Sequence, residues 1–260
     1  MRIVSMISTG LVLAFLSLAA AAQIQIPDPV KLGPYTMPGD TPGYIRQAIE
    51  SKQRTDADRA RDSSRKPAEV LKMSGIKPGD HVIEIAGFGQ YYTKLLSAIV
   101  GPNGKVDVYD LPYTESFAGA ASRAFAASHP NVNYHQEDYN NSVFPPDVDV
   151  VFNILYYHDL ILQNIDTARM NGKLLASLKP GGAYVIIDHK AEDDSGTRDT
   201  QKLHRIDVQV IKDQVTAAGF KLAAESNILA HPEDDRTRMV FTPGLRGITD
   251  RALFIFRKPK

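Results

Sequence analysis

Short apolar segments alternate with helix-like segments from His81 to the end of the chain. Strands are predicted over residues 81–85, 105–110, 132–135, 148–153, 183–188, 221–228 and 252–257. Helices are predicted over residues 118–128, 165–178 and 203–218, and Gly219 provides a favourable end for the last of them. Short apolar strands that alternate with crossover helices are typical of a parallel sheet covered by helices. The pattern therefore predicts an α/β fold.

The segment before this pattern has two parts. Residues 23–42 contain five prolines, which predict an extended lead-in. From Gly43 to about Met73 the sequence becomes helical and charged, and four charged residues recur at helical spacing: Asp58, Arg61, Asp62 and Arg65. Such spacing places side chains on neighbouring positions of a helix. Two interpretations stay open, a solvated helix that carries ion pairs and a lid over a functional site.

The first 22 residues have the organisation of a secretory signal peptide. A basic residue follows Met1, residues 3–18 are mostly apolar, and a run of alanines precedes Gln23. The alternative is a retained membrane anchor, but the apolar stretch ends in small residues rather than in a basic flank. We predict cleavage near Ala22, no stable membrane anchor afterwards, and a periplasmic or secreted protein. The predicted boundaries are 1–22 for the signal peptide, 23–66 for the lead-in and helical cover, and 67–260 for the main domain.

Composition narrows the possible function classes. The chain has 260 residues with 30 Lys and Arg against 30 Asp and Glu, so it lacks the positive charge of a nucleic-acid-binding protein. Hydrophobic residues make up 43%, which is enough for a packed core. The absence of cysteine excludes disulfides, thiolate metal sites and a cysteine nucleophile. A hydrolase or a dehydrogenase is disfavoured because neither a Gly-x-Ser-x-Gly nor a Gly-x-Gly-x-x-Gly motif is present.

Seven short motifs lie between about Asp58 and Lys258. They are Asp58-x-x-Arg61-Asp62-x-x-Arg65-x-Pro67, Pro78-Gly79-Asp80, Tyr91-Tyr92-Thr93, Leu178-Lys179-Pro180-Gly181-Gly182, Asp188-His189-Lys190, Leu203-His204-Arg205-Ile206-Asp207 and Ala218-Gly219-Phe220. Together they resemble the class I S-adenosylmethionine-dependent methyltransferases, in particular a group of predicted members that often carry export signals. The resemblance implies a Rossmann-like, seven-stranded, mostly parallel sheet with an antiparallel last strand and a helical N-terminal cover. It also implies S-adenosylmethionine as cofactor and methyl transfer to a small-molecule acceptor.

Two carboxylates end the first two predicted strands. In an open α/β sheet a ligand binds outside the carboxyl ends of the strands, so Glu84 and Asp110 are expected to face it. Asp110 suits hydrogen bonds from both ribose hydroxyls, and Asp138 after the third strand is placed to approach the adenine amino group. The alternatives are local, because Asp110 precedes Leu111 and a proline in a turn and Asp138 belongs to a polar segment. The resemblance also places Leu111 and Asn153 among the cofactor-binding residues.

The loop after the first strand departs from the family pattern. Counted from Glu84, the places of the family's glycines are held by Ala86, Phe88 and Gln90, and the spacers by Gly87 and Gly89. A residue other than glycine adopts left-handed backbone at a cost of about 1–2 kcal/mol, and its Cβ crowds a ligand. Two possibilities follow: Phe88 blocks the methionine end of the cofactor, or it points away on a reshaped loop. The resemblance assigns residues 86–89 to cofactor binding in either case.

A second group of polar side chains follows the fourth and fifth predicted strands. His158 comes after the fourth strand, Asp188 and His189 end the fifth, and His204 is expected one helical turn before Asp207. A histidine beside a carboxylate suits proton removal from a nucleophile, because its unperturbed pKa is about 6.5. Structural hydrogen bonding and coordination of a divalent ion stay open as other roles. We assign His158, Asp188, His189 and His204 as candidate catalytic residues and assign no metal ligand.

A rival hypothesis is an exported, non-catalytic binding protein that keeps the methyltransferase fold. S-adenosylmethionine is made inside cells, so an exported enzyme would need a supply of it. All three glycine places of the loop are also altered. The sequence predicts neither the identity of the acceptor nor the oligomeric state.

Overall fold

The computed structural model describes residues 27–260, so the predicted signal peptide lies outside the described residues. Within residues 27–260, no helix combines the length and the apolar character needed to cross a membrane.

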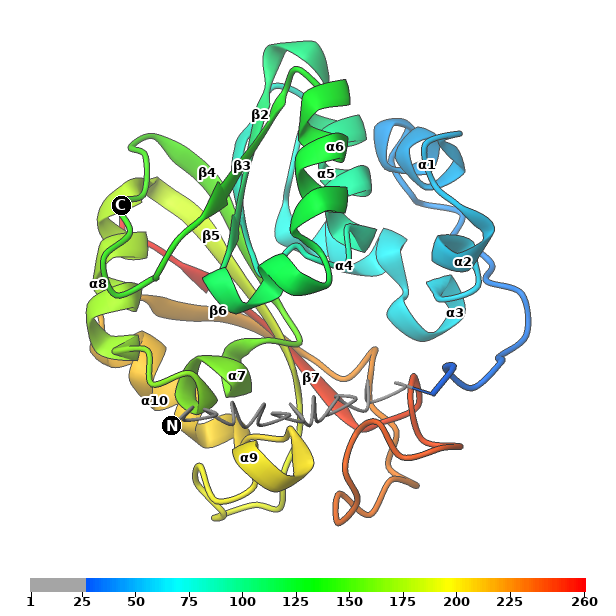
Figure 1. Cartoon of the computed structure of the whole chain (residues 1–260), viewed down its shortest axis with the longest axis vertical. Coiled ribbons are helices and arrows are strands. Elements are labelled where there is room, and N and C mark those ends of the chain that lie inside the picture. The colour runs from blue at the N-terminus through cyan, green and yellow to red at the C-terminus, as the bar shows by residue number, and fades with distance from the viewer. Residues whose placement is uncertain (1–26) are drawn as a thin grey trace, which may run out of the picture.

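Seven strands form one sheet in the order β3-β2-β1-β4-β5-β7-β6 (Figure 1). They are β1 (His81–Ile85), β2 (Lys105–Asp110), β3 (Val132–Gln136), β4 (Val148–Ile154), β5 (Leu178–His189), β6 (Lys221–Ser226) and β7 (Arg251–Arg257). β7 pairs antiparallel with both β5 and β6, and the pairs from β3 to β5 are parallel. The predicted α/β sheet with an antiparallel last strand is therefore confirmed. The strand order reverses between β1 and β4, where an open sheet binds its ligand.

Helices cover both faces of the sheet (Figure 1). α5 and α6 lie on one face together with the N-terminal helices, whereas α7, α8 and α10 lie on the other. The helices after β1 are α5 (Tyr91–Val100), α6 (Gly119–Ser128), α7 (Tyr157–Leu162), α8 (Thr167–Ser177), α9 (Thr200–Leu203) and α10 (Val208–Ala217). Two short 3-10 helices, η1 (Gly101–Asn103) and η2 (Pro112–Ser116), flank β2.

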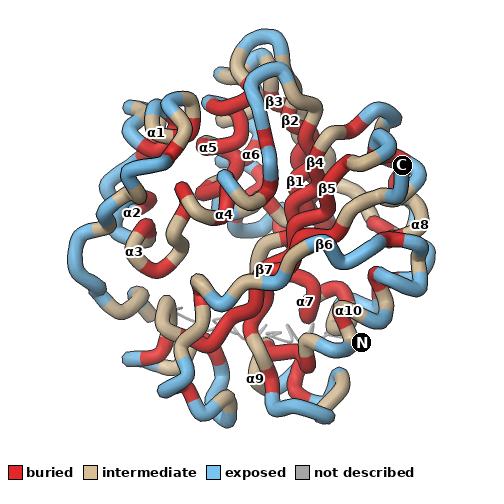
Figure 2. Tube along the Cα trace, turned by 180° about the vertical axis from the view of Figure 1, so that it is seen from behind, coloured by how far each residue is buried: buried red, intermediate tan, exposed pale blue. Residues whose placement is uncertain are grey.

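Alternation along the strands divides the core into two clusters. Val82 and Val106 pack with α1, α4 and α5 on one face, and Ile83 and Tyr109 pack with α7, α8 and α10 on the other. The central strands are buried on both faces (Figure 2), which explains their nearly continuous apolar sequence. Polar side chains that are buried at the strand ends are therefore exceptions within an otherwise apolar core.

The helical N-terminal cover consists of four short helices rather than one long helix. They are α1 (Gly43–Glu50), α2 (Asp56–Arg59), α3 (Asp62–Arg65) and α4 (Pro67–Ser74). Thr55 and Asp58 form a capping box that starts α2. Asp58 also accepts a hydrogen bond from Lys94 of α5 at 2.7 Å, and Asp62 pairs with buried Arg54. Asp62 also accepts a hydrogen bond from the Tyr91 hydroxyl of α5 at 2.5 Å. Asp58 and Asp62 therefore tie the cover to the main domain, and the charged segment is not a solvated face.

The predicted helix over residues 203–218 is wrong, because two helices occupy this range with a break between them. His204 has left-handed backbone (φ 53°), and Asp207 accepts a hydrogen bond from the backbone N–H of Gln209 and so caps α10. Between them, Ile206 is fully buried and its N–H donates to the carbonyl of His189. Pairing with the end of β5 and burial of Ile206 outweigh the helical pattern of the sequence. His204 and Asp207 are consequently not neighbours on a helix.

Candidate active site

A cavity of about 270 Å³ lies at the carboxyl ends of β1, β4 and β5. The loop after β1, the start of α7, the cover helix α3 and the segment between β6 and β7 all contribute to its lining. Polar or charged side chains at its wall include Glu84, His158, Asp159, His189 and Thr249. Concave sites with a few convergent polar groups at such a switch point are the usual ligand sites of open α/β sheets.

The loop after β1 keeps left-handed backbone without the family's glycines. Ala86 has φ 60° and Gln90 has φ 53°, at two of the three glycine places. Each costs about 1–2 kcal/mol relative to glycine. Gly87, in a spacer position, has no room for a side chain, since a Cβ would lie 2.6 Å from Val108 Cγ1. The strain of this loop is of the kind that persists at functional sites.

Phe88 lines the cavity and packs against aromatic side chains that follow β2 and β4. Its ring packs edge-on against Phe117, with ring centroids 5.7 Å apart, and against Tyr156 at 5.9 Å. The hydroxyl groups of Tyr113 and Tyr156 are 3.0 Å apart and share a hydrogen bond. We call Phe88, Tyr113, Phe117 and Tyr156 the aromatic cluster. It connects the segment after β2 to the segment after β4.

The two strand-end carboxylates have different surroundings. Glu84 lines the cavity and accepts a hydrogen bond from Thr93 Oγ1 at 2.6 Å, and burial raises its pKa to about 8. Asp110 is fully buried, and neither carboxylate oxygen has a hydrogen-bond partner. Burial raises the pKa of Asp110 to about 6, although the Tyr134 hydroxyl and the amides of Phe88 and Gly87 lie close enough to limit the shift. A buried, unsatisfied carboxylate is costly unless a ligand completes it.

The remaining candidate cofactor residues lie away from the cavity wall. Leu111 packs in the core with Tyr109. Asn153 is buried and its Nδ2 donates to the Tyr184 hydroxyl at 3.4 Å. Asp138 accepts hydrogen bonds from Asn140 N and Asn141 Nδ2, both at 3.0 Å. The cavity thus brings together Glu84 and residues 86–89, but not Asp110, Leu111, Asp138 or Asn153.

His158 and Asp188 form a buried dyad at the cavity. Asp188 Oδ1 accepts from His158 Nδ1 at 2.7 Å, and Oδ2 accepts from the His158 backbone N–H at 2.8 Å. This contact places the ring proton on Nδ1 and leaves Nε2 as the acceptor. Burial lowers the pKa of His158, but the charge of Asp188 outweighs it and the net shift is upward. A carboxylate-oriented imidazole of this kind suits a general base.

His189 has a different role from His158. Its Nδ1 is 2.8 Å from Thr249 Oγ1, and its pKa is lowered well below the usual 6.5 by burial and by nearby positive charges, including His158 and Arg251. His189 is therefore neutral at physiological pH and cannot form an ion pair with an anionic group. Asp188 contacts His158 and also accepts a hydrogen bond from the His189 backbone N–H at 2.7 Å.

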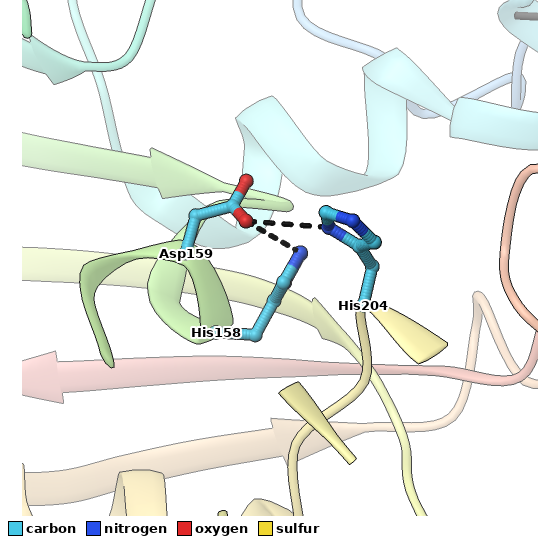
Figure 3. Close-up of side chains that lie close together, drawn as sticks. All are labelled: His158, Asp159 and His204. Carbon is cyan, nitrogen blue, oxygen red and sulfur yellow. Dashed lines mark ion pairs between the residues drawn. The ribbon is translucent and has the colours of Figure 1, made fainter. Parts of the chain in front are cut away.

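His204 approaches His158 from the break between α9 and α10 (Figure 3). His204 Nδ1 lies 3.3 Å from Asp159 Oδ1, and His158 Nε2 lies 3.4 Å from the same oxygen. The two imidazole rings are perpendicular, with centroids 5.4 Å apart. Asp159 was not included among the candidate catalytic residues predicted from the sequence. Its position directly after His158 in the sequence could have indicated that it belongs to the site.

Four arginines line the cavity and were not assigned to the site from the sequence: Arg61, Arg65, Arg246 and Arg251. Within residues 27–260, no carboxylate forms an ion pair with Arg65 or Arg251. Arg65 stacks over the Tyr91 ring at 4.7 Å, and Arg251 donates to the carbonyls of Ser64 and Gly247. Burial lowers the pKa of Arg251 to about 10, and Arg65 adds to this shift. The cavity therefore carries positive charge suited to an anionic group.

The site fits S-adenosylmethionine by its donors and acceptors. Asp110 presents two buried acceptor oxygens without partners, which the two hydroxyls of a ribose can satisfy. The unpaired arginines suit the carboxylate of a methionine moiety. Phe88 lines the cavity and its amide lies beside Asp110, which is itself outside the cavity lining. A single ligand that contacts both Asp110 and the arginines therefore has to pass Phe88.

Comparisons with known proteins bear on the fold and on the sequence of the whole chain. No family model matches the chain. The ubiquinone/menaquinone biosynthesis C-methyltransferase UbiE of Saccharophagus degradans is 26% identical over 189 residues, which cover 71% of this chain and 71% of that protein.

Solved structures share the fold at lower sequence identity. A SAM dependent methyltransferase from Aquifex aeolicus superposes with a TM-score of 0.54 at 20% identity, over 73% of this chain and 88% of that one. The [4+2]-cyclase SpnF superposes with a TM-score of 0.55 at 15% identity, over 80% of this chain and 84% of that one. By its strand order and these structural neighbours, the chain has the fold of the class I S-adenosylmethionine-dependent methyltransferases, and its sequence is similar to that of the UbiE methyltransferase.

Proposed function

We propose that the protein transfers a methyl group from S-adenosylmethionine to a small-molecule acceptor. The observation that carries the proposal is the carboxylate of Asp110, which is buried at the end of β2 without a hydrogen-bond partner. A folded chain tolerates such a group where a ligand completes it. In this family the bound cofactor supplies an electrophilic methyl group, and the protein aligns the acceptor with it.

The residues of the site have separable tasks in this proposal. Asp110 accepts hydrogen bonds from the ribose hydroxyls, and Arg65 and Arg251 neutralise an anionic group in the cavity. His158 takes a proton from the acceptor through Nε2, since Asp188 holds the proton of Nδ1. Neutral His189 and Thr249 shape the wall without adding charge.

The acceptor class is proposed from the sequence relative. The name of that protein specifies C-methylation in ubiquinone and menaquinone biosynthesis. By analogy we propose an electron-rich carbon acceptor that is activated by a neighbouring hydroxyl group. Transfer of the hydroxyl proton to His158 would raise the electron density at that carbon. This proton transfer is the step that a base can accelerate.

Export is part of the proposal and rests on the sequence alone. The basic start, the apolar stretch and the alanine run before Gln23 support cleavage near Ala22 and a periplasmic or secreted location. Sequencing the N-terminus of the protein recovered from the periplasm tests this. An intact Met1 on soluble cytoplasmic protein would contradict it.

Thermal unfolding with S-adenosylmethionine tests the methyltransferase proposal. At about 100 times its dissociation constant, a ligand stabilises the fold by ~2.7 kcal/mol, which corresponds to a rise in melting temperature on the order of 5–10 °C. Asp110→Asn should lose this rise. Asp149→Asn is the matched control and should keep it, because Asp149 lies near the amino end of β4, away from the cavity, and accepts hydrogen bonds from His81 N and Lys179 Nζ.

A non-catalytic binding protein is the second candidate function, and the packing of Phe88 favours it. The ring joins the aromatic cluster beside Asp110, and Asp110 does not line the cavity. If neither the wild type nor Phe88→Gly is stabilised by S-adenosylmethionine, the methyltransferase proposal fails and this second function is supported. A rise in Phe88→Gly alone would show that Phe88 blocks the cofactor site.

A further inference from the structure

Three side chains from two separate segments converge beside the cavity, and two of them, His158 and Asp159, line it. His158 and Asp159 belong to α7, and His204 lies in the break before α10 (Figure 3). One potential ligand atom from each lies within 4.8 Å of the others. The sequence alone placed His204 on a helix with Asp207, so this group was not foreseen as a unit.

The distances within this group suit a metal ion better than hydrogen bonds. His158 Nε2 and His204 Nδ1 lie 3.4 Å and 3.3 Å from Asp159 Oδ1. Donor atoms at about 2.0–2.2 Å from a tetrahedral zinc ion are themselves about 3.4 Å apart. His204 Nδ1 is buried and makes no hydrogen bond, so the approach to Asp159 leaves it unsatisfied.

The surroundings of His158 match those of a metal-binding histidine. Such a histidine usually donates its second ring N–H to a carboxylate, which fixes the tautomer and directs the other nitrogen toward the metal. Asp188 does this at 2.7 Å on Nδ1 and accepts the His158 backbone N–H as well. His158 Nε2 therefore carries a free lone pair and lies 3.4 Å from Asp159 Oδ1.

His204 is held in place by strained backbone and by packing. Its φ of 53° lies in the left-handed region, which costs other residues about 1–2 kcal/mol relative to glycine. Its ring packs against Phe241, with centroids 5.2 Å apart. Phe241 lines the cavity, so the strained residue lies directly behind the cavity wall. Backbone strain next to a ligand site indicates that the position of the side chain matters for function.

We propose that His158, Asp159 and His204 bind one divalent transition-metal ion such as Zn²⁺, with the remaining coordination positions open to the cavity. Two imidazoles and one carboxylate suit such ions, and three protein ligands leave room for a further oxygen ligand. Resting on the proposed function, that oxygen is the hydroxyl of the acceptor. The ion would lower the pKa of this hydroxyl so that its proton passes to solvent water in the cavity, and His158 would then act as a ligand rather than as the base.

Metal titration in the absence of S-adenosylmethionine tests the site. Protein freed of metal with a chelator is titrated with Zn²⁺ by calorimetry and with Co²⁺ by visible absorption. One ion per chain is expected. His204→Asn, in which asparagine keeps left-handed backbone accessible, and Asp159→Asn should each weaken binding at least 100-fold. Asp188→Asn should weaken it about 10–100-fold by releasing the orientation of His158.

The matched control is His231→Gln, which removes a histidine that also pairs with a carboxylate, Glu233, at 3.0 Å, but lies outside the cavity. It should bind Zn²⁺ and Co²⁺ as the wild type does. Binding of neither ion by the wild type, or equal binding by His204→Asn and Asp159→Asn, would overturn the proposal. Far-ultraviolet circular dichroism checks that each variant is folded. The thermal assay with S-adenosylmethionine is run in chelator, so the two proposals can fail independently.

Discussion

Asp107 and Asp110 lie three residues apart on β2, and both are buried, yet they have opposite surroundings. Asp107 Oδ1 contacts Asn133 Nδ2 and His135 Nε2, both at 2.9 Å. Its Oδ2 contacts His81 Nε2 at 2.6 Å and Lys105 Nζ at 3.1 Å. Asp110, at the carboxyl end of the same strand, has no hydrogen-bond partner on either oxygen.

The difference separates a carboxylate that serves the fold from one that serves a ligand. Burial alone would raise the pKa of either acid, but the partners of Asp107 outweigh it and hold its pKa well below the usual range. The neighbours of Asp110, the Tyr134 hydroxyl and the amides of Phe88 and Gly87, do not outweigh burial, and its pKa is raised to about 6. Stabilising partners therefore accumulate on the part of the strand away from the cleft, and the unpaired charge lies at the switch point.

The largest effect is expected for Asp107→Asn. An asparagine offers one acceptor oxygen and turns an N–H₂ group toward donors, so several partners lose their hydrogen bonds. The free energy of unfolding should fall by about 2–4 kcal/mol and the melting temperature by on the order of 5–15 °C. Binding of S-adenosylmethionine to the folded fraction should not change. If Asp107→Asn melted within one degree of the wild type, Asp107 would not stabilise the fold, and the proposed difference between Asp107 and Asp110 would be wrong.

Asp110→Asn is the same substitution at the unpaired position and should have the opposite effect on stability. It removes a buried, uncompensated charge, so the free energy of unfolding at pH 8 should rise by about 1–3 kcal/mol. The affinity for S-adenosylmethionine should fall at least tenfold, because the amide accepts fewer hydrogen bonds. Chemical denaturation and calorimetry measure the two effects. Lower stability with unchanged affinity would make Asp110 a structural residue.

The pH dependence of stability should distinguish the two acids by sign. The folded pKa of Asp107 is lowered, so its contribution is present above the unfolded value of about 3.9 and is lost as the pH falls below it. The folded pKa of Asp110 is raised, so its cost is absent below about pH 4 and grows up to about pH 6. Denaturation of the wild type and both asparagine variants from pH 3 to 8 measures these differences. Parallel curves for all three proteins would contradict the assignment.

Phe88→Ala should have the smallest effect on stability. The ring is only partly buried, so its loss should reduce the free energy of unfolding by about 1 kcal/mol. The affinity for S-adenosylmethionine should rise several-fold, since the aromatic cluster no longer has to open. Phe117→Ala, at the exposed edge of the same cluster, is the control and should leave the affinity within twofold of the wild type.

The fold could be predicted from the sequence because its signals are local. Apolar strands and breaker residues predicted the α/β fold, and the resemblance of the short motifs to the methyltransferase family implied the antiparallel last strand. The helix over residues 203–218 was wrong because periodicity does not reveal that Ile206 pairs with the end of β5. Long-range pairing outweighed local helical preference there.

The site was harder to predict because it is assembled from distant segments. Glu84, Asp110 and His158 follow strands, so the edge of the sheet on which they lie could be inferred. Arg246 lies in the segment between β6 and β7 and Arg251 is the first residue of β7, and no motif or periodicity there indicated a ligand site. The direction of Phe88 depends on contacts with Phe117 and Tyr156, which the loop sequence does not encode by itself.

The most direct test is to measure the pKa of the Asp110 carboxyl group with and without S-adenosylmethionine, by NMR on protein labelled with ¹³C at aspartate carboxyls. In the free protein it should titrate near pH 6, and saturation with the ligand should lower its pKa, because hydrogen bonds from the ribose hydroxyls favour the charged form. Asp107 should remain ionised well below pH 4 in both states. An Asp110 resonance that is unaffected by saturating S-adenosylmethionine would contradict the claim that this carboxylate binds the ligand.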